Sequence, residues 1–181
     1  MREISLHLID IIQNSISAKA TLIQVGIEVD TEKDYIKITI TDNGCGMDSE
    51  TLKNVKDPFV TSRKTRRVGL GLSLFEAACK RCDGYLEVYS EKGKGTEVIA
   101  YMKYNHIDRE PLGNIQDTII SVLLYENVDI VYKHSFNEST FVFDSREIKK
   151  IVGDDLNNPE ILDWIQGYIA ENIENIDGGA I

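Results

Sequence analysis

The sequence predicts an α/β fold: a two-layer sandwich of a mixed sheet with helices on one face, followed by a small α+β C-terminal extension. Three observations lead to this prediction. Apolar residues recur with the helical period near the N-terminus, two runs of alternating apolar residues follow, and the same order of one helix and two strands then repeats. We therefore expect one domain over residues 1–104 and an extension over residues 105–181.

The first domain is predicted element by element from periodicity and turn residues. Its expected elements are a helix over residues 3–18, strands over 23–29 and 36–40, a helix over 70–82, and strands over 85–90 and 96–104. Asp48 is a suitable N-cap for a further short helix. The basic, aperiodic stretch from residue 57 to residue 68 is predicted to be a loop.

The extension begins after a polar linker and is also mixed in structure. A helix is expected over residues 115–124, then a hairpin with strands at 128–132 and 140–143. The sequence DSRE at residues 144–147 is a capping-box pattern that opens a short helix. Asn158 followed by Pro159 opens the last helix, whose tail we expect to fray after Asn172.

The last helix has an apolar side. Its members are Ile161, Trp164, Ile165, Tyr168 and Ile169. Two interpretations stay open for this side: it docks on the first domain, or it binds a protein partner or a second subunit.

Composition and charge restrict the partners. The net charge of −10 argues against a nucleic acid or an anionic membrane as the main partner. No apolar stretch approaches the ~18 residues of a membrane span, and the N-terminus does not resemble a secretory signal. Three cysteines without a disulfide framework predict a cytoplasmic location, and the lone pair Cys79 and Cys82 is too small a set for a zinc site.

Four short motifs occur in fixed order within the first hundred residues. They are DIIQN at 10–14, DNGCGM at 42–47, VGLGLS at 68–73 and GKGTEV at 93–98. A dinucleotide fingerprint would need glycine where Leu74 stands, and no segment has the spacing of a P-loop. These two common nucleotide motifs are therefore excluded.

The residues of these motifs suit a nucleotide. Asp10 and Asn14 are four residues apart on one helix face, and an amide oxygen is a hard ligand of the kind Mg²⁺ prefers. A buried carboxylate such as Asp42 only accepts hydrogen bonds, so it matches the exocyclic amine of adenine and opposes the carbonyl of guanine. Glycines before the helix at residue 70 leave backbone N–H groups free to face phosphate.

Taken together, the four motifs resemble the ATP-binding domain of the GHKL superfamily, which has the Bergerat fold of DNA gyrase, the large heat-shock chaperone, histidine kinases and mismatch-repair ATPases. The resemblance covers residues 1–104. It implies that ATP and Mg²⁺ are bound, with Asn14 as the metal ligand and Asp42 as the adenine contact. It assigns Thr96 to the support of Asp42. It also implies a lid between the adenine and phosphate boxes, in which one of Arg63, Lys64, Arg66 and Arg67 neutralises the terminal phosphate; a solvated basic loop is the alternative. The nucleotide-binding residues that the resemblance implies are Asn14, Asp42, Gly44, Gly46, Met47, Lys64, Gly69, Leu70, Gly71, Leu72 and Thr96.

One position departs from the hydrolysing branches of the superfamily. They usually have glutamate where this chain has Asp10, and the glutamate orients or deprotonates the attacking group. Asp10 is therefore the candidate catalytic residue, with a side chain one methylene shorter.

The succession of DPF at 57–59, GLGLS at 69–73 and GKGT at 93–96 resembles the histidine-kinase branch more closely than gyrase. Those kinases carry a phosphoacceptor helix before the catalytic domain, and the nine residues before Asp10 have no room for one. We therefore expect a cytoplasmic kinase that phosphorylates a partner protein in trans, as the anti-sigma-factor serine kinases do. The alternatives are a slow ATPase or ATP-gated interaction module without phosphotransfer, and a degenerate interaction domain that no longer binds ATP. The expected partners are ATP and a protein phosphoacceptor or regulator, and a homodimer is also compatible with the sequence.

Overall fold

The structure is a computed structural model that describes residues 3–56 and 70–179. The helices are α1 (Ile4–Ser17), α2 (Ser49–Asn54), α3 (Leu70–Arg81), α4 (Ile115–Leu123), α5 (Ser145–Val152) and α6 (Pro159–Asp177), with a 3-10 turn η1 (Gly153–Asn157) before α6. The strands are β1 (Leu22–Asp30), β2 (Tyr35–Asp42), β3 (Tyr85–Glu91), β4 (Gly95–Lys103), β5 (Asp129–Phe136) and β6 (Ser139–Asp144). Each predicted helix and strand is found, with bounds shifted by a few residues at most except in the hairpin and the last helix, while the predicted loop over residues 57–68 lies outside the described residues.

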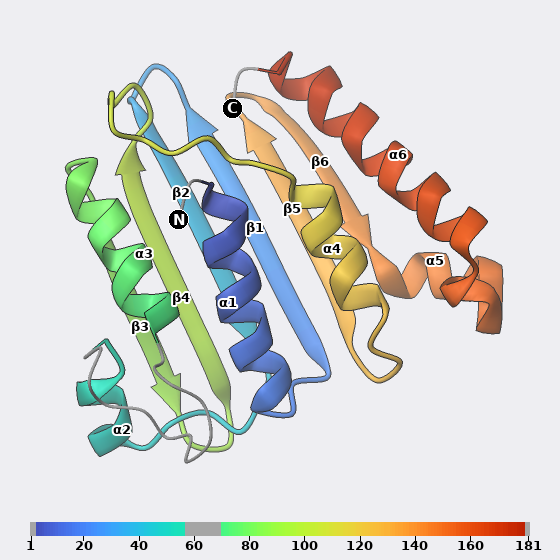
Figure 1. Cartoon of the computed structure of the whole chain (residues 1–181), viewed down its shortest axis with the longest axis horizontal. Coiled ribbons are helices and arrows are strands. Elements are labelled where there is room, and N and C mark those ends of the chain that lie inside the picture. The colour runs from blue at the N-terminus through green and yellow to red at the C-terminus, as the bar shows by residue number, and fades with distance from the viewer. Residues whose placement is uncertain (1–2, 57–69, 180–181) are drawn as a thin grey trace.

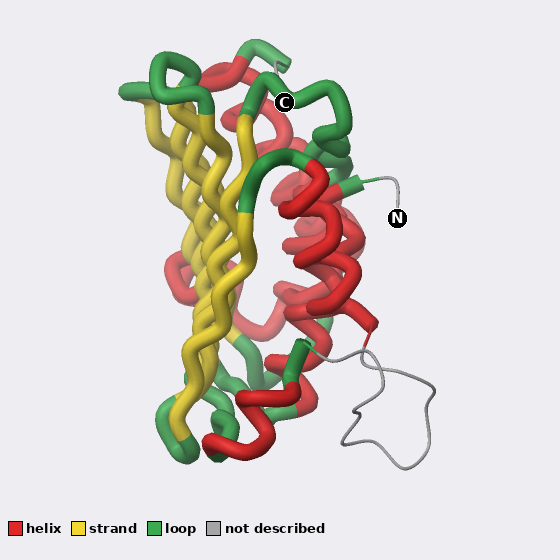
Figure 2. The backbone as a smooth tube through the Cα atoms, turned by 90° about the vertical axis from the view of Figure 1, so that its left-hand side faces the viewer, coloured by secondary structure: helices red, strands yellow, loops and turns green. Residues whose placement is uncertain are grey.

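All six strands form one sheet in the order β3-β4-β2-β1-β5-β6 (Figure 1). β1 pairs with β5 in parallel, while the other neighbours pair antiparallel, so the sheet is mixed. Figure 2 shows the sheet edge-on, with most of the helices in a single layer on one side of it. The predicted two-layer α/β sandwich is confirmed. The hairpin of the extension continues the sheet of the first half, and the division at residue 104 stays a prediction.

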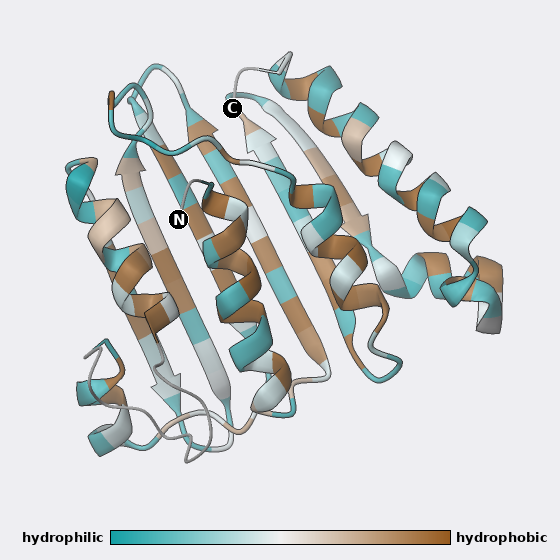
Figure 3. Ribbon diagram, viewed as in Figure 1, coloured by the Kyte–Doolittle hydropathy of each residue, from teal (hydrophilic) through white to brown (hydrophobic). Residues whose placement is uncertain are grey.

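The core lies between the sheet and the helix layer because the strands alternate. In β1, Ile23, Val25, Ile27 and Val29 are all buried, and the residues between them are exposed or half-buried. The helices also carry apolar residues, which are coloured brown in Figure 3. Burial of this alternating set fixes the register, because a slip by one residue would turn every one of these side chains to the other face.

The linker before α4 crosses the start of α1. Glu3 does not cap α1 with its side chain; instead Ile4 N and Ser5 N donate to the carbonyls of Pro111 and Leu112 at 3.0 and 2.9 Å. These N–H groups have no partner inside a helix, so the linker satisfies them. The N-terminal half and the extension therefore share backbone hydrogen bonds here as well as in the sheet.

The last helix corrects one expectation. We expected fraying after Asn172, but α6 continues to Asp177 and ends at Gly178 in the left-handed conformation, with φ of 62°. Ile173 and Ile176 are half-buried against the core, and the side chain of Asp177 is buried. Tertiary packing therefore holds a segment that its local sequence would leave loose. No helix in the described ranges is both long and apolar enough to cross a bilayer.

Candidate nucleotide-binding site

α1 presents the first two candidate residues. Its inner side is buried through Leu8, Ile11 and Ile12, which orients Asp10 and Asn14 away from the core. Asp10 is half-buried and Asn14 is exposed. Within the described residues the Asn14 side chain makes no hydrogen bond, so its amide oxygen is available to a ligand.

Asp42 ends β2 and is buried, with 8% of its surface exposed. Its Oδ2 accepts a hydrogen bond from Ser15 Oγ at 2.6 Å, and its Oδ1 accepts one from Gly44 N at 2.8 Å. Both oxygens are thereby oriented, and their remaining lone pairs can accept from a base. The carboxylate is fixed from two directions, by α1 and by the turn that follows β2.

Ser15 was not singled out from the sequence, although it contacts the carboxylate of Asp42. The available signal was a serine at a buried position of an otherwise apolar helix side, because buried hydroxyls have partners. Ser15 therefore joins the helix that carries Asn14 to the carboxylate expected to read the base.

The glycine turn after Asp42 packs closely on its neighbours. A Cβ on Gly44 would lie 2.8 Å from the carbonyl oxygen of Ala18, and one on Gly46 would lie 2.0 Å from that of Glu91. Gly46 also has a φ of +62°, which disfavours other residues. The turn is thus held between the end of α1 and the β3–β4 hairpin, and half-buried Met47 follows it.

Thr96 lies directly opposite Asp42 in the β2–β4 register. Its hydroxyl is 2.9 Å from Ser90 Oγ, and Ser90 Oγ also accepts a hydrogen bond from Met47 N at 2.8 Å. Ser90 was not singled out from the sequence, yet it joins the two boxes. Asp42 accepts its hydrogen bonds from Ser15 and Gly44 among the contacts described, and the support of Asp42 by Thr96 stays a prediction.

The start of α3 reaches the same region. A Cβ on Gly71 would lie 2.8 Å from the Cβ of Asp10, so only glycine allows α3 to approach α1 this closely. Leu70 is exposed, whereas Leu72 is buried in the core. Gly71 thus brings the third motif against the first, and the other two candidates, Lys64 and Gly69, lie outside the described residues.

An ion-pair network joins α2 to α3. Glu76 of α3 pairs with Lys56 at 3.1 Å and with Lys80 at 3.2 Å. Burial raises the pKa of Glu76, but the hydrogen bonds from the two lysines outweigh it and the pKa is lowered overall. Lys56 also donates to the Leu86 carbonyl of β3. This lysine, which follows α2, therefore connects the end of α2 to both α3 and β3.

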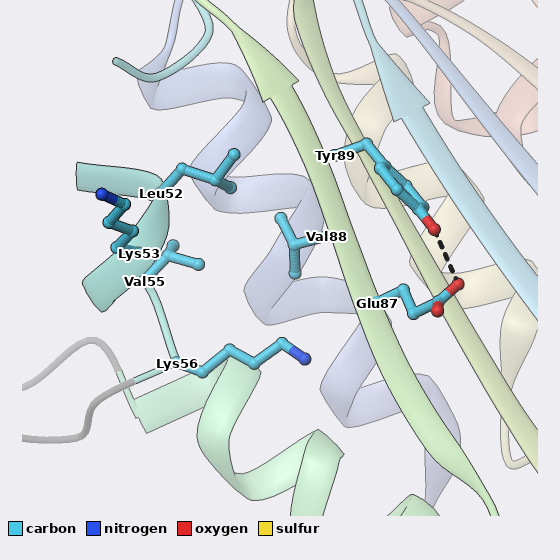
Figure 4. A pocket seen from close by; sticks show the side chains of 7 residues that line it. All are labelled: Leu52, Lys53, Val55, Lys56, Glu87, Val88 and Tyr89. Carbon is cyan, nitrogen blue, oxygen red and sulfur yellow. Dashed lines mark hydrogen bonds between the residues drawn. The ribbon is translucent and has the colours of Figure 1, made fainter. Parts of the chain in front are cut away.

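Two cavities lie at this end of the sheet. One, of about 390 Å³, lies between α2 and β3, with Leu52 and Val55 facing Val88 and with Lys56 near its wall (Figure 4). The other, of about 460 Å³, reaches Asp42 and Thr96 from the side of the β3–β4 hairpin. Neither is lined by Asp10, Asn14 or Gly71. The candidate site is therefore identified by the convergence of the motifs, and the second cavity reaches it at Asp42 and Thr96.

The donor set fits a magnesium ion that is held partly by phosphate. No group of three or more histidine, cysteine, aspartate or glutamate side chains in residues 3–56 and 70–179 could hold a metal by itself. An exposed amide oxygen such as that of Asn14 supplies one hard ligand, and Mg²⁺ is commonly bound by one or two protein groups together with substrate phosphates and water.

Comparison with known proteins identifies the family of this chain. Residues 2–106, more than half of the chain, match the family described as histidine kinase-, DNA gyrase B- and HSP90-like ATPases. The chain is 40% identical over 80 residues to an anti-sigma F factor of Clostridium perfringens, covering 44% of this chain and 53% of that protein. It is 38% identical over 88 residues to sporulation kinase C of Bacillus subtilis, covering 49% of this chain and 20% of the kinase.

A solved structure agrees in fold. It is the N-terminal domain of a DNA repair protein, with a TM-score of 0.58 at 13% identity, covering 86% of this chain and 58% of the other. The matched regions span between 14% and 53% of the first curated relatives. The family match, the fold and the convergence of the motifs agree: the chain belongs to the histidine kinase-, DNA gyrase B- and HSP90-like (GHKL) ATPase family and contains its ATP-binding domain.

Proposed function

We propose that this protein binds Mg-ATP and transfers its terminal phosphate to a partner protein in trans, in the cytoplasm. The observation that carries the nucleotide part is the fixed carboxylate of Asp42, whose two oxygens are oriented by Ser15 and Gly44 at 2.6 and 2.8 Å. An acceptor-only group with lone pairs left suits the adenine amine. The three cysteines are free thiols, which fits a reducing compartment.

In this proposal, α1 provides the polar groups at the phosphates. Asn14 binds the Mg²⁺ ion, and Asp10 acts as the base or orients the nucleophile. Gly71 supports this assignment, because its contact with Asp10 brings the start of α3 next to that carboxylate. The N-terminus of α3 would then direct backbone N–H groups at phosphate oxygens.

Phosphotransfer is favoured over hydrolysis by two observations. The relatives include a protein named as a sporulation kinase and one named as an anti-sigma factor. Asp10 also has a shorter side chain than glutamate, so its oxygen is about 1 Å or more further from a water held at the phosphate. A misplacement of that size can lower a rate on the order of 10²-fold. A slow ATPase or an ATP-gated interaction module is the second candidate.

The experiment is incubation of the purified chain with Mg²⁺ and ATP labelled at the γ-phosphate, with and without fractionated cell lysate. A kinase labels a second polypeptide, and this labelling is absent in Asn14→Ala. Release of labelled phosphate without a labelled protein would favour the ATPase. Failure of the parent chain to bind ATP in calorimetry would contradict both candidates.

Variants of Asp10 separate its roles. We expect Asp10→Ala to abolish turnover and to retain nucleotide binding, whereas Asn14→Ala weakens the Mg²⁺-dependent binding itself. Asp10→Glu should raise hydrolysis if only the reach of the side chain is deficient. Full turnover in Asp10→Ala would show that Asp10 is not the base, and would shift the assignment toward a site in which the acceptor supplies the nucleophile.

A further inference from the structure

α6 has two different sides. Ile165 and Ile169 face inward and are fully buried, in a helix that packs on α4, β5 and β6 of the extension itself. Trp164 and Tyr168 are 58% and 38% exposed. The apolar side that the sequence predicted is thus divided between the core and the surface, and α6 is the outermost element at its end of the sheet (Figure 1).

The two exposed aromatic rings are already arranged as a platform. Trp164 and Tyr168 stack with their centroids 5.4 Å apart and an angle of 9° between the ring planes. Tyr168 in turn makes an edge contact with Phe141 of β6, at 5.7 Å and 68°. Because these contacts already hold the two rings in place, Trp164 and Tyr168 lose little further side-chain entropy when a ligand stacks on them.

Gly167 lies between the two aromatic residues along the helix. It is exposed, and no heavy atom lies within 4 Å of the position that its Cβ would occupy. A glycine inside a helix costs about 1 kcal/mol relative to alanine, and here nothing in the fold requires it. Its effect is to leave room beside the aromatic pair.

The surroundings of the pair are acidic. Residues 151–181 contain seven aspartates and glutamates and no lysine, arginine or histidine. The exposed carboxylates of α6 are those of Glu160, Asp163, Glu171 and Glu174. Among the described residues, none of these four takes part in a salt bridge.

The nearby cations are already used. On α5, Arg146 pairs with Asp144, Lys149 with Asp129 and Lys150 with Glu147, at 2.6 to 2.7 Å. These three cations already have carboxylate partners, and the four exposed carboxylates of α6 have no cation partner among the described residues. The negative charge of this surface therefore favours a cationic ligand.

We propose that the outer face of α6, made of Glu160, Asp163, Trp164, Gly167, Tyr168 and Glu171, binds an arginine- and lysine-rich segment of a partner protein. These residues follow the spacing i, i+3, i+4, i+7, i+8 and i+11, so they form one stripe. An arginine stacks on the Trp164–Tyr168 platform through its guanidinium plane, and the flanking carboxylates pair with further cations. This interaction is separate from nucleotide binding and does not depend on it.

The test uses the full-length chain and a defined probe. The probe is a fluorescein-labelled helical peptide of alanine with four arginines on one face, and its control replaces each arginine with citrulline, which has nearly the same shape without the charge. Anisotropy measures binding. Emission of Trp164, the only tryptophan of the chain, reports the contact directly.

We expect saturable binding of the arginine peptide, a change in Trp164 emission, and binding roughly tenfold weaker at high salt, because exposed ion pairs are screened. The citrulline peptide should not bind measurably. Trp164→Ala should weaken binding at least about fivefold, as should the triple variant Glu160→Gln, Asp163→Asn and Glu171→Gln.

The matched control for charge is Glu32→Gln, Glu50→Gln and Glu87→Gln, which has the same net charge as the triple variant of α6. The control for aromatic exposure is Tyr85→Ala on β3, at the other edge of the sheet. Both controls should bind as the parent chain does, and all variants should keep the far-UV circular dichroism of the parent.

Three outcomes would overturn the proposal. They are equal binding of the citrulline peptide, equal weakening by the matched triple control, and no binding of the arginine peptide at low salt. Sedimentation that shows a dimer of the parent chain and a monomer of Trp164→Ala would assign this face to a second copy instead.

Discussion

At the scale of single residues, the candidate site depends on how Asp42 is held. A carboxylate inside a protein needs donors for both oxygens, and here one donor is the backbone of Gly44 and the other is the hydroxyl of Ser15. Asparagine has a single oxygen, so it cannot accept both hydrogen bonds and also present an acceptor to the base.

We therefore expect Asp42→Asn to weaken ADP binding by roughly 1–3 kcal/mol, and Ser15→Ala by about 1 kcal/mol, because removing a partner leaves a buried polar group unsatisfied. Calorimetry measures both. Asp83→Asn is the control, since this exposed carboxylate pairs with Lys103. A parent protein that prefers GDP, or unchanged ADP affinity in Asp42→Asn, would remove Asp42 from the site.

A second buried polar group connects the sheet to the end of α6. His134 is fully buried, with Nδ1 2.6 Å from Tyr132 Oη and Nε2 3.7 Å from a carboxylate oxygen of Asp177. Burial lowers the pKa of His134, and the nearby charge of Asp177 offsets this only in part. The folded protein therefore binds this proton less readily than the unfolded chain does.

Because the pKa of His134 is lower in the folded state, the free energy of unfolding should fall as the pH drops below the usual histidine value of 6.5. Above that pH, the stability contributed by the neutral His134 is fully present. The slope from this site is at most about 1.4 kcal/mol per pH unit. His134→Asn keeps an acceptor for Tyr132 and should reduce the slope. The slope that remains in this variant is expected from His7, whose pKa is also lowered by burial.

Urea unfolding at a series of pH values from about 5 to 8 measures this slope. The control is His106→Asn, at a half-buried position, introduced into both the parent and His134→Asn. The difference in pH slope between these two proteins should be the same with and without the control change. An identical pH dependence in His134→Asn and the parent would show that His134 does not couple protonation to folding.

At the scale of elements, α6 shows how packing extends a helix. Its N-terminus is readable from the sequence, because Asn158 accepts a hydrogen bond from Glu160 N and Pro159 stands in the first turn. Its C-terminus is not, because Ile173 and Ile176 stabilise the last turns only through contact with the core.

Deleting residues 173–181 should lower the free energy of unfolding by about 2 kcal/mol, since two half-buried isoleucines and the buried end of the helix are lost. Thermal unfolding monitored by circular dichroism measures the loss. Glu174→Gln, an exposed change in the same segment, should leave the melting temperature unchanged. A truncated chain that melts with the parent would mean that these turns do not contribute to stability.

At the scale of the whole molecule, the sheet runs through both halves of the chain. β1, a central strand, has β2 on one side and β5 on the other, paired over Leu22–Val29 and Asp129–Phe136. Removal of the extension would turn β1 into an edge strand with unpaired backbone groups, and would uncover the start of α1.

We expect a fragment of residues 1–104 to aggregate, or to unfold at a clearly lower temperature than the full chain, because an exposed hydrophobic edge pairs with other chains. Size-exclusion chromatography and thermal unfolding measure this. A monomeric fragment with the melting temperature of the full chain would support residues 1–104 as an independent domain.

Much of this protein could be predicted from the sequence alone. Alternating apolar residues in β1 and β2, the helical period of α1 and the caps Asp48 and Asn158 are local signals, so they determined the elements and the α/β class. The four motifs likewise determined the family, because backbone glycines and a strand-end carboxylate have specific spacing in sequence.

The tertiary structure alone decided which distant groups meet. The hydrogen bond from Ser15 to Asp42, the contact of Gly71 with Asp10 and the parallel pairing of β5 with β1 join residues that no local pattern relates. The division of the α6 side into buried Ile165 and exposed Trp164 also depends on what lies beneath the helix. Periodicity shows which side of an element is apolar, whereas only packing decides how much of that side the rest of the chain covers.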